Sequence, residues 1–491
     1  MSLEGGILPG VSDHPALVWF GLDLRLADNP ALQRAIARQG AVLPVFIWAP
    51  EEESPWSPGA ASRWWLRQSL EELDASLTMR GSKLMVRRGP TAEALLALAA
   101  ESGAESVFWN RRYEPAAMAR DRDLERRLRE RGIAAESCPG NILFEPGTIL
   151  NGNGKPYQVF TAFWRACLAM PGPEEPKPAP RRLRAPAEWP AAVAISQLGL
   201  EPKVDGARVM RQTWRPGERG ASKQMKAFLG RAIEMYSTGR DRPDRDGTSR
   251  LSAHLHFGEI TVRQIWHEVR RDRPAADPYL RQIGWREFSY HLLFHYPHTP
   301  REALRPAFRR FAWRVDGAGL RAWTRGMTGY PMVDAGMREL WHTGWMHNRV
   351  RMLAASFLVK HLILPWQEGA AWFWNTLVDA DLANNTMGWQ WSAGCGADAA
   401  PYFRIFNPVT QGERFDPDGE YVRRWVPELA RVSNQWIHKP WEAPVSLLSE
   451  AGVELGKNYP RPMVEHAAAR KRALAALGAR SFAGDQSQNL G

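Results

Sequence analysis

Three stretches, GWMHNRVRM (residues 344–352), DADLANNTMGWQW (379–391) and GADAAPYFRIFNP (396–408), set Trp directly beside Asp, Asn, His and Arg. An ordinary helical core is filled with Leu, Ile and Val. A buried polar group without a partner is strongly destabilising. The mixture therefore predicts a large ligand with a flat ring and a polar, charged remainder, and the rest of the chain is organised around residues 334–408.

The composition is that of a folded protein with a basic surface. The 491 residues are 44% hydrophobic, and the net charge of +11 permits a polyanionic partner. The 23 Trp residues are unusual, because each buried indole N–H needs a hydrogen-bond partner. Three widely spaced Cys (Cys138, Cys167 and Cys395) exclude a disulfide framework, which predicts a reducing compartment.

The chain shows no sign of membrane insertion or export. No apolar run reaches the length of a membrane span, and residues 1–12 lack the basic start and apolar core of a signal peptide. We therefore expect a cytoplasmic protein with no membrane contact.

Strand and helix patterns alternate in the first part of the chain. Strands are expected at 16–20, 41–49, 83–89, 106–110 and 134–138, and helices at 29–40, 62–80, 91–102 and 118–131. This alternation predicts βαβ units, so residues 13–145 are interpreted as one doubly wound, Rossmann-like α/β domain with a parallel sheet. No Gly-rich fingerprint follows the first strand, which disfavours a nucleotide bound in the Rossmann manner.

The chain then becomes proline-rich and afterwards helical. PGPEEPKPAPRRLRAPAEWP at 171–190 excludes regular structure, and an interdomain linker is expected at 146–220. Beyond it, apolar residues recur near every 3.6 positions, so 221–480 is predicted to be an all-helical domain that carries most of the Trp. The last residues, 481–491, are predicted to be a polar, frayed tail.

The central stretch carries charges that need partners. Asp379 and Asp381, with Asn384 and Asn385 close behind, must meet an Arg or accept hydrogen bonds from a ligand if they are buried. No His or Cys spacing around them indicates a metal.

Residues 345–352 have the spacing of a helix face. Trp345, Asn348 or Arg349, and Met352 fall on one side by three-and-four spacing. An ordinary core helix explains this pattern equally well, and His347 alone is more typical of a core histidine than of a catalyst.

In motif after motif, the chain resembles the photolyase/cryptochrome flavoprotein family over nearly its whole length. The matches stand in order along the chain: WFGLDLRLADNPAL (19–32), DGTSRLSAHLHFGEI (246–260), WREF (285–288), TGYPMVDAGMREL (328–340), GWMHNRVRM (344–352) and WQWSAGCGADAAPYFRIFNP (389–408). One chance match would be weak evidence, whereas all of them in order are specific. The resemblance implies an α/β antenna domain, a long linker and a helical FAD-binding domain.

The resemblance implies FAD in the helical domain, active as FADH⁻. Its phosphates and ribose would be held by Tyr236 and by Thr248, Ser249, Arg250, Leu251 and Ser252. The hydroxyls and N–H groups of TSRLS before a helix suit a pyrophosphate, with an ordinary N-cap as the alternative. The other implied cofactor-binding residues are Arg286, Trp345, Arg351, Asp379, Asp381 and Asn385. Arg351 would pair with Asp379, Asp381 would accept hydrogen bonds from the polar edge of the flavin, and Asn385 would face its N5.

Three Trp match the electron relay of the family. Trp389 would lie near the flavin, Trp366 between, and Trp313 at the surface, with the last two at loop-like edges. Plain packing is the alternative for each one taken alone.

The implied substrate site resembles that of photolyases acting on cyclobutane pyrimidine dimers in DNA. Trp285 and Trp391 would flank a flipped-out lesion, and Met352 would add a soft apolar contact beside Asn348. Enzymes of the (6-4) type carry His at the positions of Asn348 and Met352, and neither is His here. Gln282 and Asn385 complete the implied catalytic set.

A cryptochrome-like photoreceptor without repair activity is the main alternative, and a (6-4) photolyase is the third. Plant cryptochromes carry Asp at the positions of Asn348 and Asn385 and Tyr at that of Trp391. The short polar tail also argues against a receptor. However, PEEESPWSPGAASRWWLRQSL (50–70) resembles plant cryptochromes. The combination resembles bacterial class III dimer photolyases.

Two departures from class I photolyases concern the substrate and the antenna. Gln282 stands where class I enzymes have a Glu, so an acid role at that position is lost. Tyr113-Glu114 is followed by Pro115 instead of the folate-binding pattern, so a methenyltetrahydrofolate antenna is expected only in a class III-like mode elsewhere on the first domain.

The positions of Arg240, Arg286, Arg349 and Arg404 match residues that contact DNA phosphates in the family. Arg suits bidentate phosphate recognition, and a group of them would make binding salt-dependent. Taken singly, each is more typical of a solvated surface charge. We expect the protein to act as a monomer.

Overall fold

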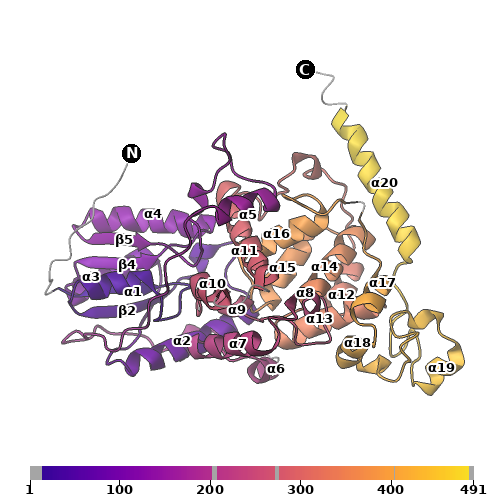
Figure 1. The fold of residues 1–491 in the computed structure, drawn as a ribbon, viewed down its shortest axis with the longest axis horizontal. Helices are drawn as coiled ribbons and strands as arrows, with labels where there is room; N and C mark the ends of the chain where they lie inside the picture. Colours follow the sequence, from indigo (N-terminus) through magenta and orange to yellow (C-terminus); the bar gives the residue numbers. More distant parts are fainter. Residues whose placement is uncertain (1–13, 202–206, 271–275, 403, 486–491) are drawn as a thin grey trace.

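The computed structural model describes residues 14–201, 207–270, 276–402 and 404–485. An α/β part and a helical part lie side by side along the longest axis, and helix α20 (His466–Asp485) projects from the helical end (Figure 1). Residue 13, at the predicted start of the first domain, and residues 486–491 of the predicted tail lie outside the described residues.

Five parallel strands form the sheet of the first part, in the order β3-β2-β1-β4-β5. They are β1 (Ala16–Phe20), β2 (Val42–Trp48), β3 (Met85–Arg88), β4 (Ser106–Asn110) and β5 (Ala134–Cys138). β1, β2 and β4 are buried along their whole lengths, as expected of strands covered on both faces. The predicted doubly wound α/β fold is confirmed.

Four helices cover the two faces of this sheet. Helices α1 (Pro30–Ala37) and α2 (Ala60–Thr78) share one core with it, and α3 (Thr91–Ser102) and α4 (Pro115–Arg129) share the other. Helix α1 begins where the sequence indicates, because the Asn29 side chain accepts a hydrogen bond from Leu32 N.

The segment predicted as a linker is only partly irregular. Residues 171–190 form no helix or strand, as their prolines require. Helices α5 (Phe160–Leu168) and α6 (Ala207–Thr213) nevertheless lie within 146–220, because apolar FTAFWRACL is long enough to bury a helical face. Short helical turns occur at η2 (Pro146–Thr148) and η3 (Ile195–Leu198), and η1 (Pro50–Glu53) precedes α2.

Helices make up the second part, and the predicted all-helical FAD domain is confirmed. They are α7 (Glu218–Arg231), α8 (Tyr236–Gly239), α9 (Ser252–His256), α10 (Val262–Arg270), α11 (Asp277–His295), α12 (Gly317–Thr324), α13 (Pro331–Thr343), α14 (Asn348–Ser356), α15 (Trp366–Thr376), α16 (Leu382–Ala393), α17 (Pro408–Phe415), α18 (Glu420–Trp425) and α19 (Val445–Glu450). Shorter turns are η5 (Pro306–Phe308), η7 (Pro427–Leu429) and η8 (Pro440–Glu442).

The structure differs from the predicted helices at two functional places. Trp345 precedes α14, which begins at Asn348 with His347 as its N-cap, so Trp345 does not share a helix face with Met352. The same predicted helix ends in a π-helical turn, η6 (Phe357–His361). Helix α20 runs to Asp485, five residues into the predicted tail.

The two parts share one packed interface, which holds the site rigidly. Arg25, 1% exposed, donates from Nη1 to Gly258 O at 3.0 Å. Gly258 has φ +61°, and a Cβ there would lie 2.3 Å from Leu22 O, so the close approach requires glycine. The carboxylate of Glu259 is buried against Trp65, which donates from Nε1 at 2.9 Å.

Within the described residues, no helix is long and apolar enough to cross a membrane. The three cysteines are buried and free. Burial raises the pKa of Cys138 and Cys395 to about 12, so these thiols are unreactive.

Candidate functional site

The polar central stretch lines the space where α11, α14 and α15 pack against α16. The predicted ion pair lies there: Arg351 Nη2 is 2.9 Å from Asp379 Oδ2 and 3.1 Å from Oδ1. Arg351 Nε also donates to Met346 O at 2.7 Å, which fixes the guanidinium plane. The pair is therefore a fixed, charged part of the candidate flavin site.

Asp381 is held by the protein on both carboxylate oxygens. Oδ1 accepts from Asn384 N at 2.8 Å and so caps α16, and Oδ2 accepts from Tyr290 Oη at 2.5 Å. Burial favours the neutral acid, but the hydrogen bond and charge of His256, with the charge of Arg286, hold the pKa of Asp381 well below its ordinary value. Its contact with a flavin edge stays a prediction.

The TSRLS segment has the backbone of an anion site. Arg250 has φ +51°, and Leu251 has φ −89° and ψ −1°, and such a change from left-handed to right-handed backbone is typical of anion-binding turns. Gln224 Nε2 donates to Ser249 O at 2.8 Å and holds the turn in place. Ser252 begins α9 and is exposed. This geometry fits a pyrophosphate better than an ordinary N-cap, and no side-chain cap is formed there.

Trp345 is a flat, buried platform with cations over its ring. The guanidinium carbon of Arg250 lies 4.8 Å from its centroid and that of Arg351 5.8 Å. Tyr236 packs edge to face on Tyr279, with the ring centroids 5.1 Å apart. An aromatic platform beside an anion site suits a nucleotide that carries both a ring and phosphates.

His347 leaves one donor unused at this platform. Its Nδ1 accepts from Arg349 N, so the proton sits on Nε2, and burial lowers the pKa of the ring to about 4. Among the described residues, Nε2 has no hydrogen-bond partner although His347 is 2% exposed. A buried unpaired donor is costly, and an acceptor group on a bound cofactor would satisfy it.

Asn385, half-buried on α16, belongs to the same candidate flavin site. Its Nδ2 donates to Ala370 O of α15 at 3.1 Å, which fixes the amide and leaves its carbonyl oxygen as an acceptor. The residues present therefore fit FAD, with an anion site, an aromatic platform, a charged wall and a fixed amide.

The predicted lesion residues come from three adjoining helices. Asn348 is exposed at the start of α14, and its Nδ2 lies 3.8 Å from Met352 Sδ one turn later. Trp285 and Gln282 are half-buried on α11, and Trp391 is half-buried on α16. These side chains reach the surface, whereas Asp379 and Trp345 are buried and Arg351 is half-buried.

Two of the three predicted relay tryptophans are buried, and the third is partly exposed. Trp389 and Trp366 are 2% and 1% exposed, and Trp313 is half-buried. Trp366 is the first residue of α15 rather than a loop residue, whereas Trp313 does lie in a loop. Arg314 N donates to Ile363 O, which ties that loop to the start of α15.

Both family models match this chain. The model for the FAD binding domain of DNA photolyase matches residues 279–479, and the DNA photolyase model matches residues 16–181. A deoxyribodipyrimidine photo-lyase of Agrobacterium fabrum is 48% identical over 95% of this chain and 98% of its own. The chain belongs to the photolyase/cryptochrome family.

Other relatives include both branches of this family. Cryptochrome-2 of Arabidopsis thaliana is 43% identical over 94% of this chain and 78% of its own. The crystal structure of a bacterial class III photolyase from Agrobacterium tumefaciens matches with a TM-score of 0.93 and 46% identity, covering 98% of this chain and 100% of that one. The family resemblance, the FAD-binding domain and the class III likeness are thus confirmed.

The four predicted DNA-contacting arginines are not equivalent. Arg404 is exposed, Arg240 is half-buried over the ring of Tyr236, and Arg349 is half-buried in an ion pair with Asp241. Arg286 is 9% exposed, and its Nη1 donates to Asn141 O at 2.7 Å. This position favours a role at the domain junction over contact with a phosphate.

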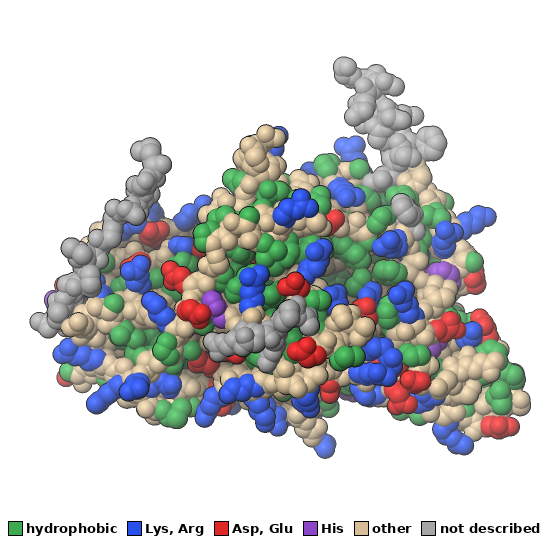
Figure 2. Space-filling model, viewed as in Figure 1, with side chains coloured by type: hydrophobic (Ala, Val, Ile, Leu, Met, Phe, Trp, Pro, Cys, Tyr) green, Lys and Arg blue, Asp and Glu red, His purple; other side chains and the backbone are tan. Residues whose placement is uncertain are grey.

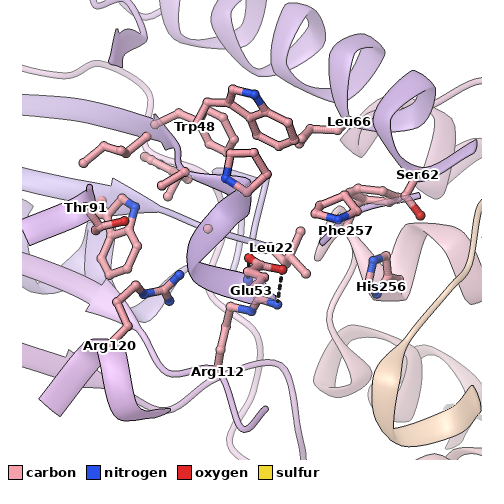
Figure 3. A pocket seen from close by; sticks show the side chains of 18 of the residues that line it. Leu22, Trp48, Glu53, Ser62, Leu66, Thr91, Arg112, Arg120, His256 and Phe257 are labelled. Atoms are coloured by element: carbon pink, nitrogen blue, oxygen red, sulfur yellow. Dashed lines mark hydrogen bonds and ion pairs between the residues drawn. The ribbon is translucent and has the colours of Figure 1, made fainter. Parts of the chain in front are cut away.

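A pocket opens at the carboxyl ends of β1 and β2, against the helical domain. Trp48, Leu66 and His256 line it, and Arg112 forms an ion pair with Glu53 at its floor (Figure 3). Burial opposes ionisation of Glu53, but the charge and hydrogen bonds of Arg112, together with the charges of Arg120 and His256, lower its pKa. His256 lines this pocket, and its Nδ1 is 3.7 Å from Oδ2 of Asp381 in the candidate flavin site.

Sequence patterns missed the residues that hold others in place. Tyr290 and His256 orient Asp381, and Gly369 gives room to the ring of Trp389. Tyr290 lies four residues after Arg286 on α11, and the Arg286 guanidinium carbon is 4.8 Å from the centre of its ring. This helical spacing is the one local signal in the sequence that could have indicated Tyr290.

Proposed function

We propose that this chain is a light-driven DNA photolyase that repairs cyclobutane pyrimidine dimers. The observation that carries the proposal is that exposed Asn348 and half-buried Trp285, Trp391 and Met352 lie on the helices that carry the candidate flavin site. Neither Asn348 nor Met352 is the histidine that (6-4) chemistry would require.

The side chains of the candidate flavin site would hold FAD through hydrogen bonds, charge and ring contacts. The TSRLS turn and the His347 Nε2 donor suit phosphate and hydroxyl acceptors, and Trp345 suits a ring. Reduced FAD, excited by light, supplies the electron for the repair. The Arg351–Asp379 pair would stabilise a charged edge of the flavin ring, and the Asn385 side-chain carbonyl would accept a hydrogen bond from the N5–H group of the reduced flavin.

The half-buried and exposed residues of α11, α14 and α16 would bind the lesion. Two indoles from neighbouring helices suit a flipped-out dimer, which pairs poorly and leaves the duplex at low cost. Asn348 and Gln282 carry amides that both donate and accept, which matches the carbonyl and N–H edges of pyrimidines. Gln282 would orient the dimer as a neutral partner without serving as an acid.

Lys and Arg side chains around the candidate lesion site would bind the DNA phosphates. Figure 2 shows Lys and Arg side chains spread around the hydrophobic surface over α5 and α11. Arg240, Arg349 and Arg404 are the candidates for phosphate contacts, and binding would weaken as salt rises. We expect a monomer acting in the cytoplasm, where its three buried thiols stay reduced.

The cavity of the first domain is the candidate antenna site. It combines aromatic walls such as Trp48 with the Arg112–Glu53 pair, as a folate with a flat ring and a charged end would need. Methenyltetrahydrofolate is the proposed occupant. An absorption spectrum tests this, since a near-ultraviolet band besides the flavin bands is expected and Trp48→Ala should reduce that band alone.

The direct test of the function is repair under blue light. Reduced protein is incubated with DNA carrying either a cyclobutane dimer or a (6-4) product. Restored pyrimidines from the dimer alone are expected, and Asn348→Ala should lower the rate while flavin content stays unchanged. No repair of either lesion would overturn the proposal.

A photoreceptor without repair is the second candidate, because cryptochromes are 41–43% identical to this chain. It predicts light-dependent recruitment of a partner and equal affinity for damaged and undamaged DNA. Selective binding of dimer-containing DNA together with repair would exclude it.

A further inference from the structure

Helix α5 of the linker packs against α11 (Figure 1). The rings of Phe160 and Trp285 are stacked, with centroids 3.8 Å apart and an interplanar angle of 9°. Phe160 is 0% exposed, whereas Trp285 is half-buried. One face of the indole therefore rests on a fully buried ring from a different segment of the chain.

The contact is fixed on both sides. A Cβ at Gly284 would lie 2.6 Å from the Trp164 ring, so glycine lets α5 approach α11 at the residue before Trp285. Trp164 is nearly parallel to Phe160, at 10°. The stack thus has a rigid base.

The loop after α16 fastens the start of α5. Phe160 N donates to Asp398 Oδ2 at 3.2 Å, and Asp398 holds a left-handed backbone with φ +45°. Asp tolerates this conformation better than most residues. Asp398 follows Trp391 by seven residues, so the two segments that carry the indoles meet at Phe160.

We propose that Phe160 is a positioning residue that sets the orientation of Trp285 for recognition of damaged DNA. The inference deepens the proposed function and rests on it. A half-exposed indole otherwise samples several rotamers, and fixing one of them on binding costs conformational entropy. The Phe160 ring holds one orientation before DNA arrives, which removes that cost from binding.

The test compares Phe160→Leu with Phe163→Leu. Phe163 lies one turn later on α5, is 2% exposed and packs on Phe288 and His291 instead of Trp285. Both variants lose a buried ring, and only Phe160→Leu loses the stack. The dissociation constant of each full-length holoprotein is measured for single-stranded DNA with one dimer and for the same strand undamaged.

Phe160→Leu should weaken binding of the dimer strand by about three- to tenfold, the size expected for an aromatic pair. Its affinity for undamaged DNA and its flavin spectrum should match the native protein, and Phe163→Leu should keep the native preference. The inference would be overturned if both variants preferred the dimer strand over the undamaged strand to the same degree, or if Phe163→Leu alone lost that preference. A native protein without any preference for the dimer would overturn the proposed function instead.

Asp398 supplies a second test that leaves the rings intact. Asp398→Asn keeps an oxygen acceptor and tolerates the left-handed backbone, so native dimer preference is expected. Asp398→Ala removes the acceptor and should lower the preference for the dimer strand in the same direction as Phe160→Leu. An Asp398→Ala protein with native preference would show that the hydrogen bond to Phe160 N is not needed, and would contradict the proposed positioning of Trp285 through Phe160.

Discussion

Replacing Gly369 by alanine should move the first relay tryptophan. A Cβ at Gly369, in the first turn of α15, would lie 2.0 Å from Cη2, 2.5 Å from Cζ3 and 2.6 Å from Cζ2 of Trp389. Carbon atoms in contact prefer about 3.5–4.0 Å, so the ring must shift by about 1–2 Å. Overpacking of this kind costs about 1–3 kcal/mol.

Gly369→Ala should therefore lower the free energy of unfolding by about 1–3 kcal/mol and slow photoreduction of oxidised FAD. Repair by chemically reduced protein should persist, because the relay only loads the flavin. Gly388→Ala is the matched control: it lies on α16 with Trp389, is exposed and has no atom within 4 Å of an added Cβ. It should raise stability by about 0.5–1 kcal/mol and leave photoreduction unchanged.

Flavin release on heating reports stability, and flavin absorbance under blue light reports photoreduction. If Gly369→Ala loses stability but is photoreduced at the native rate, Trp389 is not the first relay residue. If Gly369→Ala keeps both the native stability and the native rate of photoreduction, Gly369 does not pack against the Trp389 ring as described.

Three further predictions follow from single residues. Trp313→Phe should slow photoreduction while repair by pre-reduced protein stays near native, and equal loss of both would contradict the relay. Burial raises the pKa of Glu287 to about 7, so the native state holds a proton that the unfolded chain releases and stability falls as pH rises from about 4.5 to 7. Glu287→Gln, which can still accept from Leu143 N, should remove this fall in pH-dependent unfolding curves. Burial lowers the pKa of Lys360 to about 8, so stability should rise between about pH 8 and 10.5, and Lys360→Met should flatten that rise; a native-like rise in the variant would assign it to another group.

The fold was largely predictable, because its elements follow local patterns. Buried parallel strands are continuous apolar runs, and α3 begins and ends where the periodicity predicts it, at 91 and 102. Helix α5 was missed because the prolines after residue 170 made its surroundings look irregular. Trp345 was placed on α14 because three-and-four spacing does not reveal where an N-cap interrupts a helix.

The candidate site was only partly predictable. Motifs named Arg351, Asp379 and the relay tryptophans, since these residue types are rare inside a helical core. Whether Asp381 is open to a ligand depends on Tyr290 and His256, which lie 91 and 125 residues earlier. Such contacts leave no mark in local sequence.

The sequence by itself determined the two-domain class, because local patterns carry it, and its family motifs predicted an FAD site and the candidate lesion residues. Only the tertiary structure decided how those residues are held. Phe160 meets Trp285 across 125 residues, and Gly369 makes room for Trp389 between two helices. Close packing fixes such positions through neighbours that are distant in the chain, so they appear only once the chain is folded.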